Sequence, residues 1–339
     1  MNDNYKYFID YLACPYSKKK LVLEINNGSS YLTSGAKKYL IQNNIPLLIS
    51  KLNYADVSDE KFIKSIEKFW NSGWDKRSKE DDHSPLYKLN EKEMLNRLKR
   101  KYDIQQSRGE GIGNYFSNEI KLDMLQDKTS VIIGPGCGEE AMQLRFICKA
   151  KVIGIDISLK SASLTNSLLN KFGHKSGIGI QGDSRFLPIQ SNSVDFVFSN
   201  GVLHHSPNIQ KSVEEIYRIL KPGGKFCVCL YHKHSIVWMK FLLKALIKGK
   251  WTKKSLDQYI SSQTEVSWIT DDQTNPYTQL FSYSKCSKLF DIFDRIQIRS
   301  GNFHTPGNFL LKFLALAENT KIMSKFGTMI YVSGSKSDN

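Results

Sequence analysis

A glycine-rich run between two apolar segments constrains this chain more than any other feature. Residues 130–139, Ser-Val-Ile-Ile-Gly-Pro-Gly-Cys-Gly-Glu, are followed by residues 152–158, Val-Ile-Gly-Ile-Asp-Ile-Ser. Glycines at alternate positions let the backbone turn sharply from a strand into a helix and approach a ligand that a Cβ would keep away. An acid at the end of the second segment is placed to accept ribose hydroxyls. The run therefore predicts a nucleotide-binding loop.

Three further segments narrow this prediction, because a glycine-rich loop alone also occurs in dinucleotide-binding dehydrogenases. Gln-Gly-Asp-Ser at 181–184 ends a short apolar run, and residues 193–205 form a strand-like segment that ends in Asn-Gly-Val-Leu-His-His. Leu-Lys-Pro-Gly-Gly-Lys-Phe at 220–226 indicates a helix end, a tight turn and a strand. By these four motifs, residues from about 109 to 231 resemble class I S-adenosylmethionine-dependent methyltransferases. The resemblance is strongest to the branch that modifies small molecules and includes quinone methylases.

The resemblance implies S-adenosyl-L-methionine as the cofactor and no metal. The residues that it assigns to cofactor binding are Gly134, Gly136, Gly138, Asp156, Ile157, Asp183, Ser184 and Asn200. Among them, the three glycines would lie under the methionine part and Asp156 would bind the ribose hydroxyls. Asp183 would accept a hydrogen bond from the adenine amino group, and Asn200 would lie beside the methionine. A carboxylate suits both acid positions because it only accepts hydrogen bonds.

One position departs from the family pattern. The family usually has an acid two residues before the first glycine, and this chain has Ile132 there. That carboxylate normally helps to hold the methionine end of the cofactor. We therefore expect either weaker binding or replacement by another acid such as Glu139. A degenerate fold without catalytic activity is a further interpretation.

Methyl transfer from a sulfonium requires an acceptor atom held in line and the removal of any proton that it carries. His205, at the end of the segment 193–205, is our candidate general base, and Tyr231 and His232 are its rivals. Paired histidines such as His204 and His205 are also common in the resembled branch without a direct part in catalysis.

Alternating strands and helices predict a mainly parallel sheet covered on both faces. The expected strands are residues 130–133, 152–156, 179–181, 194–199, 225–230, 295–300 and 329–333, with a helix over 284–293. The fold class is therefore α/β, a Rossmann-like class I methyltransferase with a mainly parallel seven-stranded sheet, plus a small N-terminal β-rich domain. The methyltransferase domain is assigned to residues 126–335, with an insertion at about 232–283.

The first segment contains Leu-Ala-Cys-Pro at 12–15 and Asn-Asn-Ile-Pro-Leu-Leu at 43–48. Through these residues it resembles the small zinc-ribbon-like activator subunit of tRNA methyltransferases, and it is assigned to residues 1–52. Structural zinc needs four ligands, but only Cys14 is present and Ser17 stands where its partner would be, so we expect no zinc site. Asn27-Gly28 between alternating segments predicts a hairpin, and apolar contacts with the larger domain should hold this module.

Residues 53–125 are assigned to a helical cap and linker, with helices at about 59–70 and 90–102. Its aromatic residues either line the cofactor cleft or pack between domains, and both interpretations remain open. These residues are Phe69, Trp70, Trp74, Tyr115 and Phe116.

The insertion contains an amphipathic helix over 236–248 in which Lys240, Lys244 and Lys248 share one face. Three interpretations compete: a substrate lid, a membrane-surface or partner helix, and plain core packing. The apolar stretch 309–317 is expected to pack beside it and to form a hydrophobic acceptor pocket.

A formal net charge of +15 favours an anionic or acidic partner, such as RNA or a membrane surface, or reflects only a lysine-rich composition. No apolar run is long enough to span a membrane and no secretory signal is evident, so a cytoplasmic protein is expected. Six cysteines without a Cys-x-x-Cys pair predict buried reduced thiols.

Our leading hypothesis is a methyltransferase of the EC 2.1.1 class that acts on a small-molecule biosynthetic intermediate. The first alternative is an rRNA or tRNA methyltransferase, favoured by the basic charge and the zinc-ribbon-like segment. The second alternative is a degenerate methyltransferase fold that serves as a binding scaffold. Residues 199–202 lack the Asn/Asp-Pro-Pro-aromatic motif expected for methylation of adenine amino groups.

Overall fold

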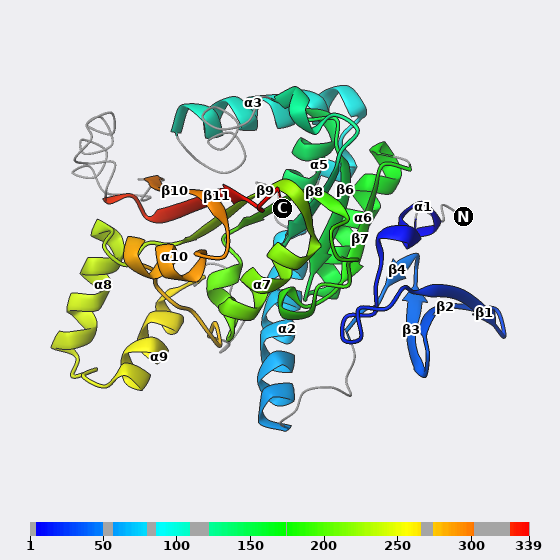
Figure 1. Ribbon diagram of the computed structural model, residues 1–339. Coiled ribbons are helices and arrows are strands. Elements are labelled where there is room, and N and C mark those ends of the chain that lie inside the picture. Colours follow the sequence, from blue (N-terminus) through cyan, green and yellow to red (C-terminus); the bar gives the residue numbers. More distant parts are fainter. Residues whose placement is uncertain are drawn as a thin grey trace.

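The computed structural model describes residues 5–49, 57–79, 86–108, 122–173, 175–265, 274–301 and 326–338. Its largest element is a seven-stranded sheet (Figure 1). The strands are β5 (Thr129–Ile133), β6 (Lys151–Asp156), β7 (Gly177–Gln181), β8 (Val194–Asn200), β9 (Leu220–Tyr231), β10 (Asp294–Gly301) and β11 (Met329–Ser335). Their spatial order is β10-β11-β9-β8-β5-β6-β7, and only β11 runs antiparallel to both of its neighbours. The strand order reverses between β5 and β8, which is where open α/β sheets bind ligands.

Helices cover both faces of this sheet, so the central strands β5, β6 and β8 are buried along most of their length. Val131 and Ile133 of β5 belong to the core on the face covered by α7 (Ile209–Ile219) and α10 (Tyr283–Leu289). Ile132, between them, points to the opposite face and packs with α5 (Glu139–Phe146). Helices α3 (Glu91–Arg108) and α6 (Leu159–Phe172) join α5 in a further apolar cluster on that side.

A second, antiparallel sheet forms near the N-terminus. It follows the short helix α1 (Tyr5–Phe8) and consists of β1 (Val22–Asn26), β2 (Ser29–Ser34), β3 (Lys37–Gln42) and β4 (Ile45–Pro46) in sequence order. Asn27 and Gly28 join β1 to β2 with φ angles of 49° and 76°. Positive φ at both positions is the requirement of a type I′ turn, so the predicted hairpin is confirmed.

The small sheet packs against the β7 edge of the large sheet. The Leu48 amide donates to the Gln181 carbonyl at 2.9 Å, and the Ala13 amide donates to the Pro188 carbonyl at 3.0 Å. Leu12 is fully buried in the same apolar core as Ile180. Backbone pairing and a shared core therefore join the two sheets and cover an edge that would otherwise be open to aggregation.

The insertion after β9 forms a helical hairpin of α8 (Ile236–Ile247) and α9 (Lys253–Gln263). It projects from the large sheet on the side opposite the N-terminal sheet (Figure 1). Helix α2 (Val57–Arg77) runs along the sheet between these two outer parts. No helix in the described ranges has the length and apolar character needed to cross a bilayer.

The sheet confirms the predicted fold class and the predicted strands. The helix expected over 284–293 ends at Leu289, because the chain turns at Phe290 before entering β10. Strand β9 begins at Leu220, earlier than expected, because Gly223 and Gly224 exchange backbone hydrogen bonds with Lys336. Short 3₁₀ helices are η1 (Ile9–Tyr11), η3 (Leu86–Lys88), η4 (Leu122–Leu125), η5 (Ser184–Phe186) and η6 (Leu203–His205). Residues 115, 116 and 309–317 lie outside the described residues.

The shared core makes a stability prediction. Leu12→Ala should lower the free energy of unfolding by about 2–5 kcal/mol, because it leaves a cavity at a fully buried position between the two sheets. Urea denaturation measures the change. Ile25→Ala is the control: Ile25 lies on β1 with 68% of its surface exposed, and its loss should cost less than about 0.5 kcal/mol. An unchanged urea midpoint for Leu12→Ala would contradict a common core.

Candidate functional site

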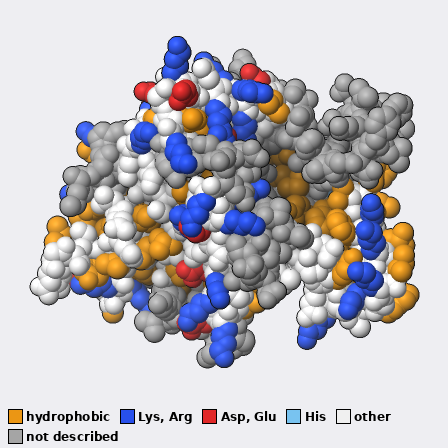
Figure 2. All heavy atoms as spheres, turned by 180° about the vertical axis from the view of Figure 1, so that it is seen from behind, with side chains coloured by type: hydrophobic (Ala, Val, Ile, Leu, Met, Phe, Trp, Pro, Cys, Tyr) orange, Lys and Arg blue, Asp and Glu red, His pale blue; other side chains and the backbone are white. Residues whose placement is uncertain are grey.

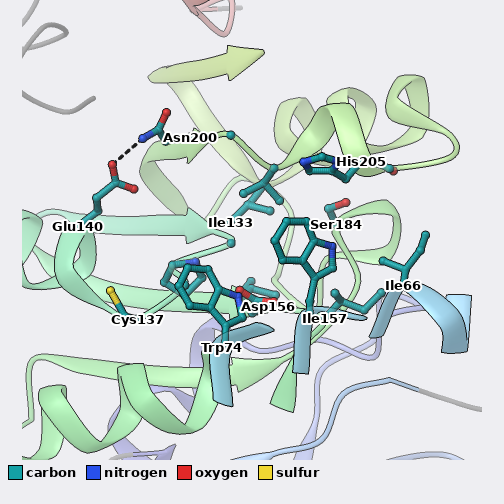
Figure 3. A pocket seen from close by; sticks show the side chains of 18 of the residues that line it. Ile66, Trp74, Ile133, Cys137, Glu140, Asp156, Ile157, Ser184, Asn200 and His205 are labelled. Atoms are coloured by element: carbon teal, nitrogen blue, oxygen red, sulfur yellow. Dashed lines mark hydrogen bonds between the residues drawn. The ribbon is translucent and has the colours of Figure 1, made fainter. Parts of the chain in front are cut away.

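A cavity of about 500 Å³ lies at the carboxyl ends of β5, β6 and β8 (Figure 3). Its size is within the range of about 300–1,000 Å³ that is usual for ligand pockets. Most of the residues predicted to bind a cofactor line it, namely Gly134, Gly136, Asp156, Ile157, Asp183, Ser184 and Asn200, and so does the candidate base His205. The structure thus brings together residues that are widely separated in the sequence.

The glycine-rich turn leaves no space for side chains on its cavity side. A Cβ on Gly134 would lie 2.2 Å from a methyl carbon of Val202, and one on Gly136 would lie 2.4 Å from the ring of Trp74. Both glycines have positive φ angles, 74° and 60°. Gly138 lies behind the turn at the start of α5, where a Cβ would lie 3.1 Å from the Thr165 backbone. The first two glycines shape the cavity wall, and the third permits close packing of α5 on α6.

Asp156 ends β6 with its carboxylate at the cavity. One oxygen accepts a hydrogen bond from the Ser158 amide at 2.9 Å and the other accepts one from the Ser161 hydroxyl at 2.5 Å. Burial raises its pKa to about 6, and these hydrogen bonds oppose the rise. Backbone hydrogen bonds from Gly136 and Ile157 also lower the pKa, so the carboxylate is held by the glycine turn as well as by the start of α6.

Asp183 and Ser184 lie at the end of β7, next in line along the cavity. The buried Asp183 carboxylate pairs with Arg185, whose terminal nitrogen is 2.8 Å from one oxygen. The Arg185 amide donates to the other oxygen at 2.9 Å. An adenine amino group would therefore have to share Asp183 with Arg185. The Ser184 hydroxyl lies 2.9 Å from the Ser212 hydroxyl, which fixes η5 to α7.

Asn200 lies at the end of β8, and its side-chain amide donates to the Glu140 carboxylate at 2.7 Å (Figure 3). Glu140 lines the cavity, and burial raises its pKa while the Lys101 ammonium opposes the rise. An acid with its second oxygen available to a ligand therefore stands at this end of the cavity. Sequence reasoning did not identify Glu140.

Glu139, the acid expected to replace the one missing at position 132, lines the cavity together with its neighbour Glu140. Glu139 is held by Lys101 in a close ion pair and lies 3.6 Å from Arg97, both on α3. Its neighbour Glu140 contacts Asn200 instead, because adjacent positions on a helix point in different directions. Ile132 itself is fully buried on the sheet face away from the α7 core. An acid at that position is absent, and Glu140 is the carboxylate that the fold supplies near Asn200.

Helix α2 closes the cavity with one face. The residues that it contributes, Ile63, Ile66, Trp70, Trp74 and Arg77, recur every three or four positions. This spacing was present in the sequence but was not recognised there. Of the predicted aromatic residues, Trp70 and Trp74 line the cavity, whereas Phe69 is buried and packs edge-on against Trp70 at 5.2 Å.

Helix α2 is held in place by a polar contact with the start of α6. Asn71 accepts hydrogen bonds from the Ser158 hydroxyl at 2.8 Å and from the Lys160 amide at 3.0 Å. Ser158 also donates its amide to Asp156. The loop that positions the site carboxylate therefore also positions the helix that covers it.

His205 lies at the opposite end of the cavity from Glu140 in Figure 3. Its Nδ1 lies 2.9 Å from the carbonyl oxygen of Tyr277, 3.1 Å from the side-chain amide of Asn275 and 3.1 Å from the Thr278 hydroxyl. Its Nε2 is buried and has no hydrogen-bond partner among the described residues. Burial lowers the pKa of the ring, and the Glu265 charge and the Tyr277 carbonyl oppose this. The lowered pKa favours the neutral imidazole, which can accept a proton.

Tyr231 and His232, the alternative candidate bases, have different hydrogen-bond partners from His205. The Tyr231 hydroxyl donates to Glu265 in a short hydrogen bond, and burial raises its pKa well above the ordinary value. The His204 ring stacks on Tyr231 with centroids 3.8 Å apart. His232 contacts the Gly327 carbonyl through Nδ1 at 2.9 Å and packs near Tyr283. Of these three residues only Tyr231 lines the cavity, and its hydroxyl proton is donated to Glu265.

In the described ranges of the chain, no group of three or more His, Cys, Asp or Glu residues could hold a metal ion. Cys14, the remaining candidate from the zinc-ribbon resemblance, is buried with its sulfur 3.1 Å from the Tyr39 hydroxyl. The zinc-ribbon-like character of the N-terminal sheet stays a prediction.

Comparison with known proteins identifies a domain that coincides with this site. Residues 131–228 match a family model described as a methyltransferase domain. A ubiquinone/menaquinone biosynthesis C-methyltransferase from Rickettsia typhi is 29% identical over 147 residues, which cover 40% of this chain and 58% of that protein. Phosphoethanolamine N-methyltransferase 2 from Caenorhabditis elegans is 31% identical over 111 residues, 33% of this chain and 25% of that protein. The chain thus spans less than two thirds of the length of these relatives.

Among solved structures, Haemonchus contortus phosphoethanolamine N-methyltransferase 2 in complex with S-adenosyl-L-methionine aligns with a TM-score of 0.45 at 16% identity. The alignment covers 66% of this chain and 53% of that one. Residues 131–228 are therefore similar to methyltransferase domains, and both relatives are named as methyltransferases.

The raised pKa of Asp156 predicts a pH dependence of cofactor binding. The ionised Asp156 carboxylate accepts hydrogen bonds from two ribose hydroxyls better than the protonated carboxyl does. The ionised form is lost as the pH falls through about 6. Affinity for S-adenosyl-L-methionine should therefore fall by up to about tenfold per pH unit below that point. Calorimetric titration between about pH 5 and pH 8 measures it.

Two variants distinguish the contributions of the Asp156 and Glu140 carboxyls to the pH dependence of cofactor binding. Asp156→Asn should bind more weakly than the wild type at about pH 8, approach it at about pH 5, and lose the part of the pH dependence that Asp156 causes. Glu140→Gln removes the other cavity acid whose pKa burial raises, and should retain the Asp156 dependence. If the wild-type affinity is constant over this pH range, the assigned role of Asp156 is wrong.

Proposed function

We propose that this protein is an S-adenosylmethionine-dependent methyltransferase that acts on a small-molecule biosynthetic intermediate. The observation that carries the proposal is a single cavity with two chemically different ends. One end holds the glycine turn and the carboxylates of Asp156 and Glu140; the other holds the free Nε2 of His205 beside Trp70 and Tyr231. A cofactor and an acceptor can therefore meet within one enclosed space.

The chain fits this cofactor at each of its polar parts. Asp156 would receive the ribose hydroxyls, and the turn at Gly134 and Gly136 would accept the chain of the methionine part without steric conflict. The Glu140 carboxylate would accept hydrogen bonds from the amino group of the methionine, and the Asn200 side-chain amide would donate to its carboxyl group. When bound, the cofactor supplies a methyl group that its sulfonium already activates, so the protein needs mainly to position the acceptor.

His205 is the group that would take the acceptor's proton. Contacts of its Nδ1 with the Tyr277 carbonyl, the Asn275 amide and the Thr278 hydroxyl hold the ring at the cavity wall. As the acceptor atom forms its bond to the methyl carbon, Nε2 would accept the proton that this atom loses. The Glu265 charge nearby favours the imidazolium that results.

A small acceptor is favoured over RNA because α2 covers the cavity with apolar and aromatic side chains. Ile63, Ile66 and Trp70 enclose the end near His205, and Trp70 approaches the His205 ring to 5.1 Å between centroids. Apolar walls with few polar groups suit an organic ring or chain. The Rickettsia relative is named for quinone biosynthesis, so demethylated quinols are the first acceptors to test.

The assigned base can be tested without knowledge of the natural acceptor. His205→Gln retains polarity but removes the basic nitrogen, and should lower turnover by about 100-fold to 10,000-fold. Affinity for S-adenosyl-L-methionine should remain within about twofold, because the residue lies at the acceptor end. S-adenosylhomocysteine release in the presence of demethylated quinols and small amines is the readout.

His234→Gln is the matched control, because His234 is exposed and follows the end of β9. It should retain wild-type turnover. If His205→Gln retains full turnover with every acceptor that the wild type methylates, His205 is not the base.

A further inference from the structure

The outer side of the α8–α9 hairpin exposes large apolar side chains. Met239, Leu243 and Ile247 recur at every fourth position of α8 with 51%, 60% and 78% of their surfaces exposed. Trp251, in the turn that follows, is 77% exposed. Residues spaced in this way form one stripe along a helix. We call these four residues the apolar stripe.

The apolar stripe is surrounded by positive charge. Residues 236–256 contain Lys240, Lys244, Lys248, Lys250, Lys253 and Lys254 and no acidic residue. The lysines at 240, 244 and 248 each follow a member of the stripe by one position, so they flank it along the helix. Figure 2 shows hydrophobic and basic side chains next to each other on the α8–α9 hairpin, at the lower right of that view.

The hairpin has its own buried face, so the apolar stripe is not the side that packs it against the protein. Trp238 and Ala245 of α8 are buried against Tyr259 and Ile260 of α9. The polar N-caps are also satisfied, with Ser235 accepting from the Trp238 amide and Thr252 accepting from the Ser255 amide. Exposure of the stripe is therefore a property of a well-formed helix pair.

We propose that the α8–α9 hairpin docks onto the surface of a bilayer that contains anionic lipids. The apolar stripe would enter the boundary between headgroups and acyl chains, and the flanking lysines would remain among anionic headgroups. Trp251 at the tip has the amphipathic ring that favours this boundary. The helix lies on the membrane rather than across it, consistent with its twelve residues.

The charge distribution argues against other occupants of this surface. A second copy of the chain packed through the same face would place its six lysines against six more, with no acid in residues 236–256 to pair them. A nucleic acid would pair with the lysines but leave the aliphatic members of the stripe exposed, since it binds through phosphates and base stacking. An anionic bilayer satisfies both features at once.

Docking at this place would bring the acceptor end of the cavity close to the membrane. Trp238 of α8 lies 5.0 Å between ring centroids from Tyr231, which lines the cavity, and Tyr231 donates to Glu265 just after α9. The hairpin is therefore built on the cavity wall. Membrane docking is inferred from the exposed side of the hairpin and does not depend on the proposed reaction.

Co-sedimentation with lipid vesicles tests the proposal. The protein should sediment with vesicles of equal parts phosphatidylcholine and phosphatidylglycerol, and about tenfold less with phosphatidylcholine alone or at high salt. Leu243→Glu combined with Ile247→Glu should lower binding to the anionic vesicles by about tenfold or more. Both positions are exposed, so circular dichroism should show an unchanged fold.

The matched control is Val22→Glu combined with Ile25→Glu on β1, where the replaced side chains are 61% and 68% exposed. It should sediment like the wild type. Equal sedimentation of the α8 variant and this control would overturn the proposal. So would a wild-type protein that ignores anionic vesicles but forms a dimer in analytical ultracentrifugation that the α8 variant loses.

Discussion

The close backbone turn between β5 and α5 is the constraint on which the rest of the site depends. Side chains at Gly134 and Gly136 would overlap Val202 and Trp74, so the turn, the β8 loop and α2 can pack together only where the Cβ atoms are missing. That packing brings the ends of β5, β6 and β8 to one cavity. This packing positions the side chains of Asp156, Glu140, Asn200 and His205 at the cavity.

Two supports keep the cavity closed. Asn71 of α2 binds the Ser158 hydroxyl, and Ser158 binds Asp156, so the cover and the carboxylate share one hydrogen-bonded unit. On the far side, the N-terminal sheet pairs with β7 through Leu48 and contributes to the same apolar core. The N-terminal segment therefore stabilises β7, the strand beside β6, which ends at Asp156. No group of metal ligands lies among the described residues.

The strands were predictable from the sequence because apolar runs and glycine turns are local patterns, whereas their spatial order is known only from the structure. Asp156 could be placed at a strand end for the same reason. The choice between Glu139 and Glu140 was not predictable, since it depends on the rotation of α5 about its axis. The placement of the His205 ring depends on the Tyr277 carbonyl, which lies 72 positions away in the sequence. The exposure of Met239, Leu243 and Ile247 required knowledge of which side of α8 meets α9.

The central claim is that the glycine turn forms the wall of an S-adenosyl-L-methionine site. Calorimetric titration of the cofactor into the wild-type protein and into Gly136→Val tests it most directly. The account predicts one bound equivalent for the wild type and no measurable binding for the variant, because the added side chain would collide with the Trp74 ring and displace the cavity wall. A correctly folded wild-type protein that binds no cofactor, or a variant that binds it equally well, would contradict the account.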